Sequence, residues 1–199
     1  MKNHRSRIVH IVRFLVPANW PVVCAAVAVF LSLTPALFAQ RDVHASLVAP
    51  ALRKPAPAFR LTAETGRPTR LSDYRGKVVL LNFWASECGG CVLEIPSIVD
   101  IETAYTKKPF TVVGVSMDIP WDGLKDAKQA WGKVKPFMAQ RKINYPILMG
   151  YESLFTEFGL TALPDTLLID KSGRIAAVYV GIINKDNVEA NVNKLLLER

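Results

Sequence analysis

Residues 77–96 read KVVLLNFWASECGGCVLEIP, and this stretch decides the fold. The run Val78–Trp84 is almost wholly apolar, as expected of a β-strand that is buried on both faces. Cys88 and Cys91 follow after a short turn, and a helix is expected to begin at this pair. The two cysteines are therefore predicted to lie at a strand-to-helix junction.

Strand-like and helix-like segments alternate on both sides of this junction. Short apolar runs predict strands, and apolar residues every three or four positions predict helices. A turn at 170–173 joins the last two strands as an antiparallel hairpin. The predicted strands are 59–63, 70–71, 77–84, 110–117, 145–149, 166–169 and 175–180, and the predicted helices are 88–105, 124–141, 154–158 and 187–197. This order predicts an α/β fold, a mixed sheet with helices on both faces.

The composition fits one packed domain. Half of the 199 residues are hydrophobic and 21% are charged, which favours a folded core over disorder. The net charge of +8 is not gathered into a long basic run of the kind that nucleic-acid binders carry. We therefore expect no nucleic-acid partner, and we expect no bound cofactor.

Residues 1–39 are expected to be either an export signal or a membrane anchor. Residues 14–40 contain no charged side chain and four basic residues precede them, which is typical of a secretory signal. The same stretch is long enough to span a bilayer as an uncleaved anchor. Both alternatives predict that the domain is exported. Residues 40–57 contain three prolines and no sustained period, so we expect a linker there and one domain over 58–199.

The spacing of Cys88 and Cys91 indicates thiol–disulfide exchange. A helix N-terminus lowers the pKa of a thiol, and two intervening residues allow a disulfide to close within one helical turn. The first cysteine of such a pair usually attacks the substrate and the second resolves the mixed disulfide. Cys88 is therefore the expected nucleophile and Cys91 the expected resolving thiol.

Two structural roles for the pair are alternatives to this chemistry. Half of a zinc site would need two further ligands, and the predicted domain contains no other cysteine or histidine. A structural disulfide across two residues would constrain the unfolded chain very little. No metal site is expected. The remaining cysteine and the histidines all precede the predicted domain, at Cys24, His4, His10 and His44.

Two segments resemble the TlpA-like family, the membrane-tethered thioredoxins of bacteria. Residues 82–96, NFWASECGGCVLEIP, are similar to its active-site signature, and residues 158–170, FGLTALPDTLLID, to its second signature. Residues 110–149 resemble the block that the family has between them. The resemblance implies a thioredoxin fold with an inserted strand–helix block, an exported location, and reduction of disulfides in periplasmic proteins, often apocytochrome c. It also implies a membrane electron donor that reduces the pair again.

The resemblance implies roles for residues outside the cysteine pair. The family's second-signature proline is cis, so Pro164 is expected to be cis and Leu163 to present its backbone to a substrate strand. Glu94 is expected to lie partly buried near the thiols and to carry a proton, the alternative being a solvated helix surface. Trp84 is expected to form the floor of the substrate site. Asn82, where thioredoxins carry an aspartate, cannot titrate.

The chain departs from this family at Glu87 and at Gly89-Gly90. Glu87 stands next to the nucleophile where the family most often has tryptophan, so a substrate would meet a carboxylate there. The two glycines each cost about 1 kcal/mol of helix propensity. Because no cation is expected around Cys88, its thiolate should be poorly stabilised, and the pair should act as a reductant.

Two other activities of the thioredoxin fold are alternatives to disulfide exchange between proteins. A peroxiredoxin needs a threonine and a proline near its cysteine and a positioning arginine, whereas residues 84–87 read WASE. A copper-delivery protein uses two cysteines and a distant histidine, and the predicted domain has no histidine. Both therefore rank behind disulfide exchange between proteins.

Overall fold

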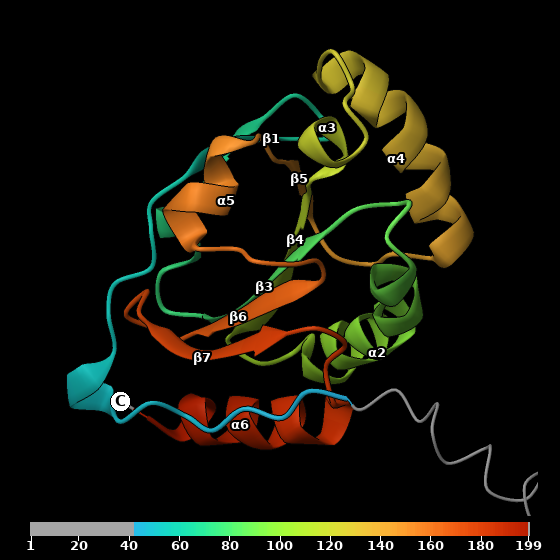
Figure 1. Ribbon diagram of the computed structural model, residues 1–199. Coiled ribbons are helices and arrows are strands. Elements are labelled where there is room, and N and C mark those ends of the chain that lie inside the picture. The colour runs from blue at the N-terminus through green and yellow to red at the C-terminus, as the bar shows by residue number, and fades with distance from the viewer. Residues whose placement is uncertain (1–41, 199) are drawn as a thin grey trace, which may run out of the picture. The chain divides into compact units, whose positions relative to one another are not determined.

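The computed structural model describes residues 42–198, which form a seven-stranded sheet with helices on both faces (Figure 1). The strands lie in the order β2-β1-β5-β4-β3-β6-β7, with β3, β4 and β5 parallel and the other pairs antiparallel. The predicted α/β class and mixed sheet are confirmed. The strands are β1 (Arg60–Ala63), β2 (Pro68–Arg70), β3 (Val78–Trp84), β4 (Phe110–Ser116), β5 (Ile147–Met149), β6 (Asp165–Ile169) and β7 (Ile175–Val180).

The two central strands are buried on both faces, as the apolar runs predicted. Every residue of β3 and of β4 is buried, and the two strands pair over their full length. Strand β6 joins the other side of β3 and continues through a tight turn into β7. In that turn the Asp170 carboxylate accepts hydrogen bonds from the N–H groups of Ser172 and Arg174 at 2.9 and 3.0 Å. Such a side-chain-to-backbone turn fixes the predicted hairpin.

Helices pack on the sheet in two sets. Residues of α2, α4 and α6 pack with one face of β3 in the larger hydrophobic core, and α5 contributes to a second core on the other face (Figure 1). Alternating strand residues supply the two cores, because successive side chains of a strand point to opposite faces. The helices are α2 (Gly89–Tyr105), α3 (Asp118–Trp121), α4 (Ala127–Arg141), α5 (Ser153–Phe158) and α6 (Lys185–Leu197), with short 3₁₀ turns η2 (Pro50–Leu52) and η3 (Leu71–Tyr74).

The helix predicted over 124–141 begins three residues later in the structure, at Ala127. Helix α4 begins at Ala127 because Asp126 caps it, accepting a hydrogen bond from the Gln129 N–H at 2.8 Å. The short helix α3, which the pattern did not predict, lies between β4 and this cap. The predicted inward face of α4 is confirmed, since its apolar residues all belong to the larger core: Ala127, Ala130, Val134, Phe137 and Met138.

Residues 40–57 were expected to form a linker. The structure describes 42–57 of this segment and shows these residues packed on the domain, which corrects the expectation. The Val43 N–H donates to the Ile182 carbonyl at 2.7 Å, and the Val48 N–H donates to the Ala176 carbonyl at 2.8 Å. The chain runs along α6 in Figure 1. Its alternating apolar residues pack against the larger core, a short strand-like period that the sequence contained: Val43, Ala45 and Leu47.

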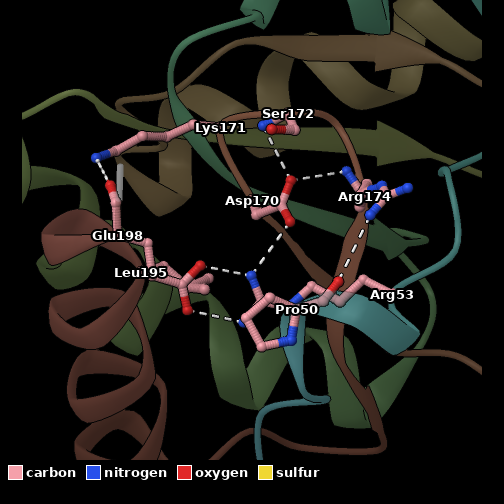
Figure 2. A pocket seen from close by; sticks show the side chains of 8 residues that line it. All are labelled: Pro50, Arg53, Asp170, Lys171, Ser172, Arg174, Leu195 and Glu198. Carbon is pink, nitrogen blue, oxygen red and sulfur yellow. Dashed lines mark hydrogen bonds and ion pairs between the residues drawn. The ribbon is translucent and has the colours of Figure 1, made fainter.

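A buried arginine fastens this N-terminal segment to the end of the chain (Figure 2). The Arg53 guanidinium donates two hydrogen bonds to the Glu198 carboxylate at 2.6 and 2.8 Å, and a third to Asp170 at 3.2 Å. Two parallel bonds between guanidinium and carboxylate fix direction as well as distance. Lys171 adds hydrogen bonds to the carbonyls of Leu196 and Glu198. The segment is therefore part of the folded unit.

The predicted signal or anchor, 1–39, lies outside the described residues. Between residues 42 and 198, none of the helices combines the length and the apolar character needed to cross a bilayer.

Candidate active site

The cysteine pair lies where β3 passes into α2, as predicted. Cys88 is the N-cap residue of α2, and its sulfur accepts a hydrogen bond from the Cys91 N–H at 3.2 Å. The two cysteines form a disulfide with their Cα atoms 5.2 Å apart. Cys88 keeps 5% of its surface exposed, whereas Cys91 is completely buried. The first sulfur is therefore the one that a substrate can reach more easily.

The N-terminus of α2 places positive potential at the Cys88 sulfur. When the disulfide is reduced, the Cys91 N–H can remain a donor to the Cys88 thiolate. The helix dipole adds a partial positive charge at the same end, and both effects favour the ionised thiol. The position of Cys88 at this junction therefore favours the thiolate that disulfide exchange requires.

A cis peptide bond joins Leu163 to Pro164 beside the pair, which confirms the expected cis proline. A Cβ atom added at Gly90 would lie 3.2 Å from the Pro164 side chain, so the proline packs directly on the first turn of α2. The Pro164 carbonyl accepts a hydrogen bond from the Gly181 N–H at 2.8 Å. Neither the N–H nor the C=O of Leu163 bonds to any residue from 42 to 198. Leu163 therefore presents two unused backbone groups next to the disulfide.

Glu94 is buried beneath the pair, and the alternative of a solvated helix surface is excluded. Only 1% of its surface is exposed. Its carboxyl accepts hydrogen bonds from the Asn82 side-chain amide at 2.7 Å and from the Ile183 N–H at 3.2 Å. Burial raises the pKa of Glu94 to about 8; the two hydrogen bonds oppose this rise and the Asp165 charge adds to it. Glu94 can therefore gain or lose a proton near neutral pH.

Asn82 connects Glu94 to the neighbouring strand. Its amide donates to Glu94 and also to the Thr166 hydroxyl, the latter at 2.9 Å. Asn82 is completely buried, and its side-chain oxygen has no hydrogen-bond partner among the described residues. As expected of an amide, it holds the Glu94 carboxyl by a hydrogen bond and does not titrate itself.

Asp165 is a second buried carboxyl that the sequence analysis missed. It follows the cis proline directly and is only 2% exposed. One of its carboxyl oxygens has no partner among the described residues, and burial raises its pKa to about 6. A charged residue at the head of the apolar strand DTLLI was the signal that could have revealed it. Two carboxyl groups with raised pKa values therefore lie around the redox centre.

A cation does lie at the turn before the nucleophile, so the expectation that none is present is corrected. The Lys133 ammonium group of α4 is 3.1 Å from the Glu87 carboxylate and 2.6 Å from that of Asp122. Glu87 is adjacent to Cys88 and its side chain is 66% exposed. The sequence could not show this pairing, because the fold alone brings α4 over the turn.

A buried aspartate fixes the same turn from the other side. The Asp118 carboxylate accepts hydrogen bonds from the Ser86 N–H at 3.1 Å and from the Ser86 hydroxyl. Its second oxygen accepts from the Ser116 hydroxyl at 2.7 Å. Asp118 is completely buried at the start of α3. Asp118 thus holds the backbone two positions before Cys88. Its role was not predicted from the sequence.

Trp84 differs from the expectation that it contacts the substrate. It is completely buried, and its indole stacks on the Phe137 ring of α4 with centroids 5.3 Å apart and planes at 24°. Its position at the end of β3 points it into the larger core. Trp84 therefore supports the site from beneath, while Glu87 and Leu163 remain accessible from outside.

The folded part of the chain contains a histidine, contrary to the expectation from the sequence. His44 belongs to the packed N-terminal segment and is exposed there. Within residues 42–198, however, no three histidine, cysteine or acidic side chains come close enough together to bind a metal ion.

Comparisons with known proteins agree with this geometry. The Redoxin family model matches residues 51–196. The thiol-disulfide oxidoreductase ResA of Geobacillus thermodenitrificans is 29% identical over 140 residues, covering 70% of this chain and 75% of that protein. The thioredoxin-like protein YneN of Bacillus subtilis is 29% identical over 138 residues, covering 69% and 76%.

A solved structure, of a putative thiol:disulfide interchange protein DsbE from Chlorobium tepidum, is 31% identical with a TM-score of 0.63, covering 72% of this chain and 96% of that one. The thioredoxin fold and the expected resemblance are thereby confirmed. The chain belongs to the Redoxin family, as a TlpA/ResA-like thiol–disulfide oxidoreductase of the thioredoxin fold.

Proposed function

We propose that this protein is an exported reductase that opens disulfides of periplasmic proteins, apocytochrome c among them, through the Cys88–Cys91 dithiol. One observation carries the proposal: Cys88 caps α2, and the first turn of α2 packs at Gly90 against the cis proline Pro164. That combination offers an attacking sulfur and an adjacent backbone edge for an extended substrate. Both features are needed for exchange with another polypeptide.

The reaction proceeds in two exchange steps. The Cys88 thiolate attacks one sulfur of the substrate disulfide, forming a mixed disulfide and releasing the other substrate sulfur as a thiolate, which takes a proton. The Cys91 thiolate then attacks the Cys88 sulfur and releases the second substrate sulfur. The substrate gains two electrons and two protons, and the enzyme is left with the Cys88–Cys91 disulfide that the structure contains. A dithiol donor in the membrane would reduce this disulfide again.

Glu94 is the proposed proton acceptor for the resolving step. Cys91 is buried and must lose its proton before it attacks, and Glu94 lies on the next turn of the same helix. Its raised pKa, about 8, means that a proton can pass either way near neutral pH. Proton transfer to a positioned base is typically worth roughly 10²- to 10⁴-fold in rate.

The substrate is proposed to bind along Leu163. An extended peptide can pair with the free N–H and C=O of this residue, as strands pair with an exposed sheet edge. Glu87 would lie at the rim of this site and meet the residue next to the substrate cysteine. This backbone pairing would hold the substrate disulfide against Cys88. Because it uses only main-chain groups, it would not require a particular substrate sequence.

The reducing direction is supported by the charges around Cys88. One cation, Lys133, is shared between two carboxylates, Glu87 and Asp122, so this group keeps a net negative charge. A negative neighbour disfavours the thiolate, and a less stable dithiolate state gives up its electrons more readily. Equilibration with glutathione tests this, with an expected potential near that of thioredoxin, about −270 mV. A potential near −120 mV would make the protein an oxidant and overturn the proposal.

Trapping experiments test the roles of the two cysteines. In a Cys24→Ser background, Cys91→Ser is expected to accumulate a mixed disulfide with insulin or an oxidised apocytochrome peptide, because the second step cannot occur. Cys88→Ser is expected to be inactive and to trap nothing. Mass spectrometry identifies the trapped sulfur, and trapping by the Cys88→Ser protein would reverse the assignment. An alkaline phosphatase fusion, active only outside the cytoplasm, tests export separately.

A further inference from the structure

The helix α4 extends over the turn that leads to the nucleophile, and it reaches that turn with one charged side chain. The Lys133 ammonium group lies 3.1 Å from Glu87, the residue immediately before Cys88. The Lys133 side chain is 32% exposed and that of Glu87 is 66% exposed, so only the lysine end of this pair is partly shielded from water. A partly shielded charge acts on its neighbours more strongly than a fully solvated one.

The turn cannot easily move away from α4. Ser86 is held by two hydrogen bonds to the buried Asp118 carboxylate, at the start of α3. Asp122, just after α3, accepts a hydrogen bond from Lys133 at 2.6 Å. Residues on both sides of Lys133 thus fix its ammonium group relative to the turn. The inserted α3–α4 segment and the redox centre are therefore joined by polar contacts as well as by core packing.

We propose that Lys133 is a positioning residue for thiol–disulfide exchange, which holds Glu87 away from Cys88 and offsets its charge, and so sets the reactivity of the Cys88 sulfur. Without Lys133, the Glu87 carboxylate would stand unpaired beside the sulfur and oppose formation of the thiolate. The inference deepens the proposed function and rests on Cys88 being the attacking thiol.

Several other ionisable groups belong to the elements of the site: Asp118 on α3, Asp122 after it, Glu94 on α2 and Asp165 on β6. Asp118, Glu94 and Asp165 form no ion pair with Lys133 and are the same in every variant. Asp122 loses its hydrogen bond from Lys133 in the Lys133→Met variant. Lys135, on the same helix, provides a matched control: it pairs with Glu64 at 3.5 Å, and both side chains are about half exposed.

The experiment measures the rate of Cys88 alkylation by iodoacetamide against pH in the reduced full-length protein. Lys133→Met is expected to raise the pKa of the Cys88 thiol by about half a unit to one unit. Alkylation well below that pKa then slows roughly three- to tenfold. Lys133→Arg is expected to restore the wild-type profile, and Lys135→Met to leave it unchanged. Glu87→Gln should move the profile in the opposite direction.

The combined Lys133→Met, Glu87→Gln variant separates this inference from a general loss of packing. Removing both charges is expected to return the profile close to that of wild type, because a cation and an anion with opposite effects on the thiolate are lost together. An unchanged profile in Lys133→Met, or a double variant as slow as Lys133→Met alone, would overturn the inference. Mass spectrometry of the alkylated protein shows which cysteine reacts. Preferential labelling of Cys91 would instead refute the proposed function.

Discussion

Replacing Glu94 by glutamine should change how the stability of this protein depends on pH. The ordinary pKa of a glutamate, 4.5, is raised to about 8 in the folded protein because the carboxyl group is buried. Between these two values the folded state holds a proton at Glu94 that the unfolded state has already lost. The free energy of unfolding therefore falls as pH rises through this window.

The size of the effect follows from the two pKa values. Each pH unit in the window lowers the free energy of unfolding by about 1.4 kcal/mol, so the whole window is worth about 5 kcal/mol. Glutamine keeps the shape and hydrogen-bonding capacity of the side chain and does not titrate. The free energy of unfolding of Glu94→Gln should therefore rise by about 5 kcal/mol relative to that of wild type as the pH goes from 4 to 9.

Urea unfolding of the disulfide form at several pH values measures this difference. Asp165→Asn serves as a comparison, because burial raises the pKa of Asp165 from 3.8 to about 6. It should remove a fall of only about 3 kcal/mol, confined to the acid end of the range. Parallel stability curves for wild type and Glu94→Gln would refute the reasoning. They would mean that the folded carboxyl titrates where the unfolded one does.

Glu94→Gln should also remove an inflection near pH 8 from the rate of insulin reduction, which stopped-flow kinetics would detect. Gly90→Ala should slow that reduction several-fold, because the added Cβ would lie 3.2 Å from Pro164. Gly89→Ala is the control, because no atom lies within 4 Å of its added Cβ. It should preserve the rate and raise the free energy of unfolding by up to about 1 kcal/mol in a urea titration. Arg53→Met should lower the free energy of unfolding by about 2 kcal/mol, because it leaves the Asp170 carboxylate without its cation; unchanged urea midpoints would contradict this.

The local pattern was enough to predict the sheet and the nucleophile. Apolar runs fix which strands are central, because a strand buried on both faces has no room for polar alternation. The cysteine spacing fixes the exchange chemistry, because two sulfurs within one helical turn can close a disulfide. The cis bond at Pro164 came from a motif and is confirmed. The packed segment before residue 58 was missed, because its three alternating apolar residues are a short signal that three prolines follow.

The sequence by itself therefore determined the strand order along the chain, the redox pair, and the helix end that activates it. Only the tertiary structure decided which charges surround that pair. Lys133, Asp118 and Asp165 come from separate elements, and no periodicity in the sequence reports that Lys133 pairs with Glu87, that Asp118 holds Ser86, or that Asp165 is buried after the cis proline. The burial of Glu94 likewise depends on the loop at Ile183 and on β3. Electrostatic effects depend on distance and solvent access, and both are properties of the packed chain.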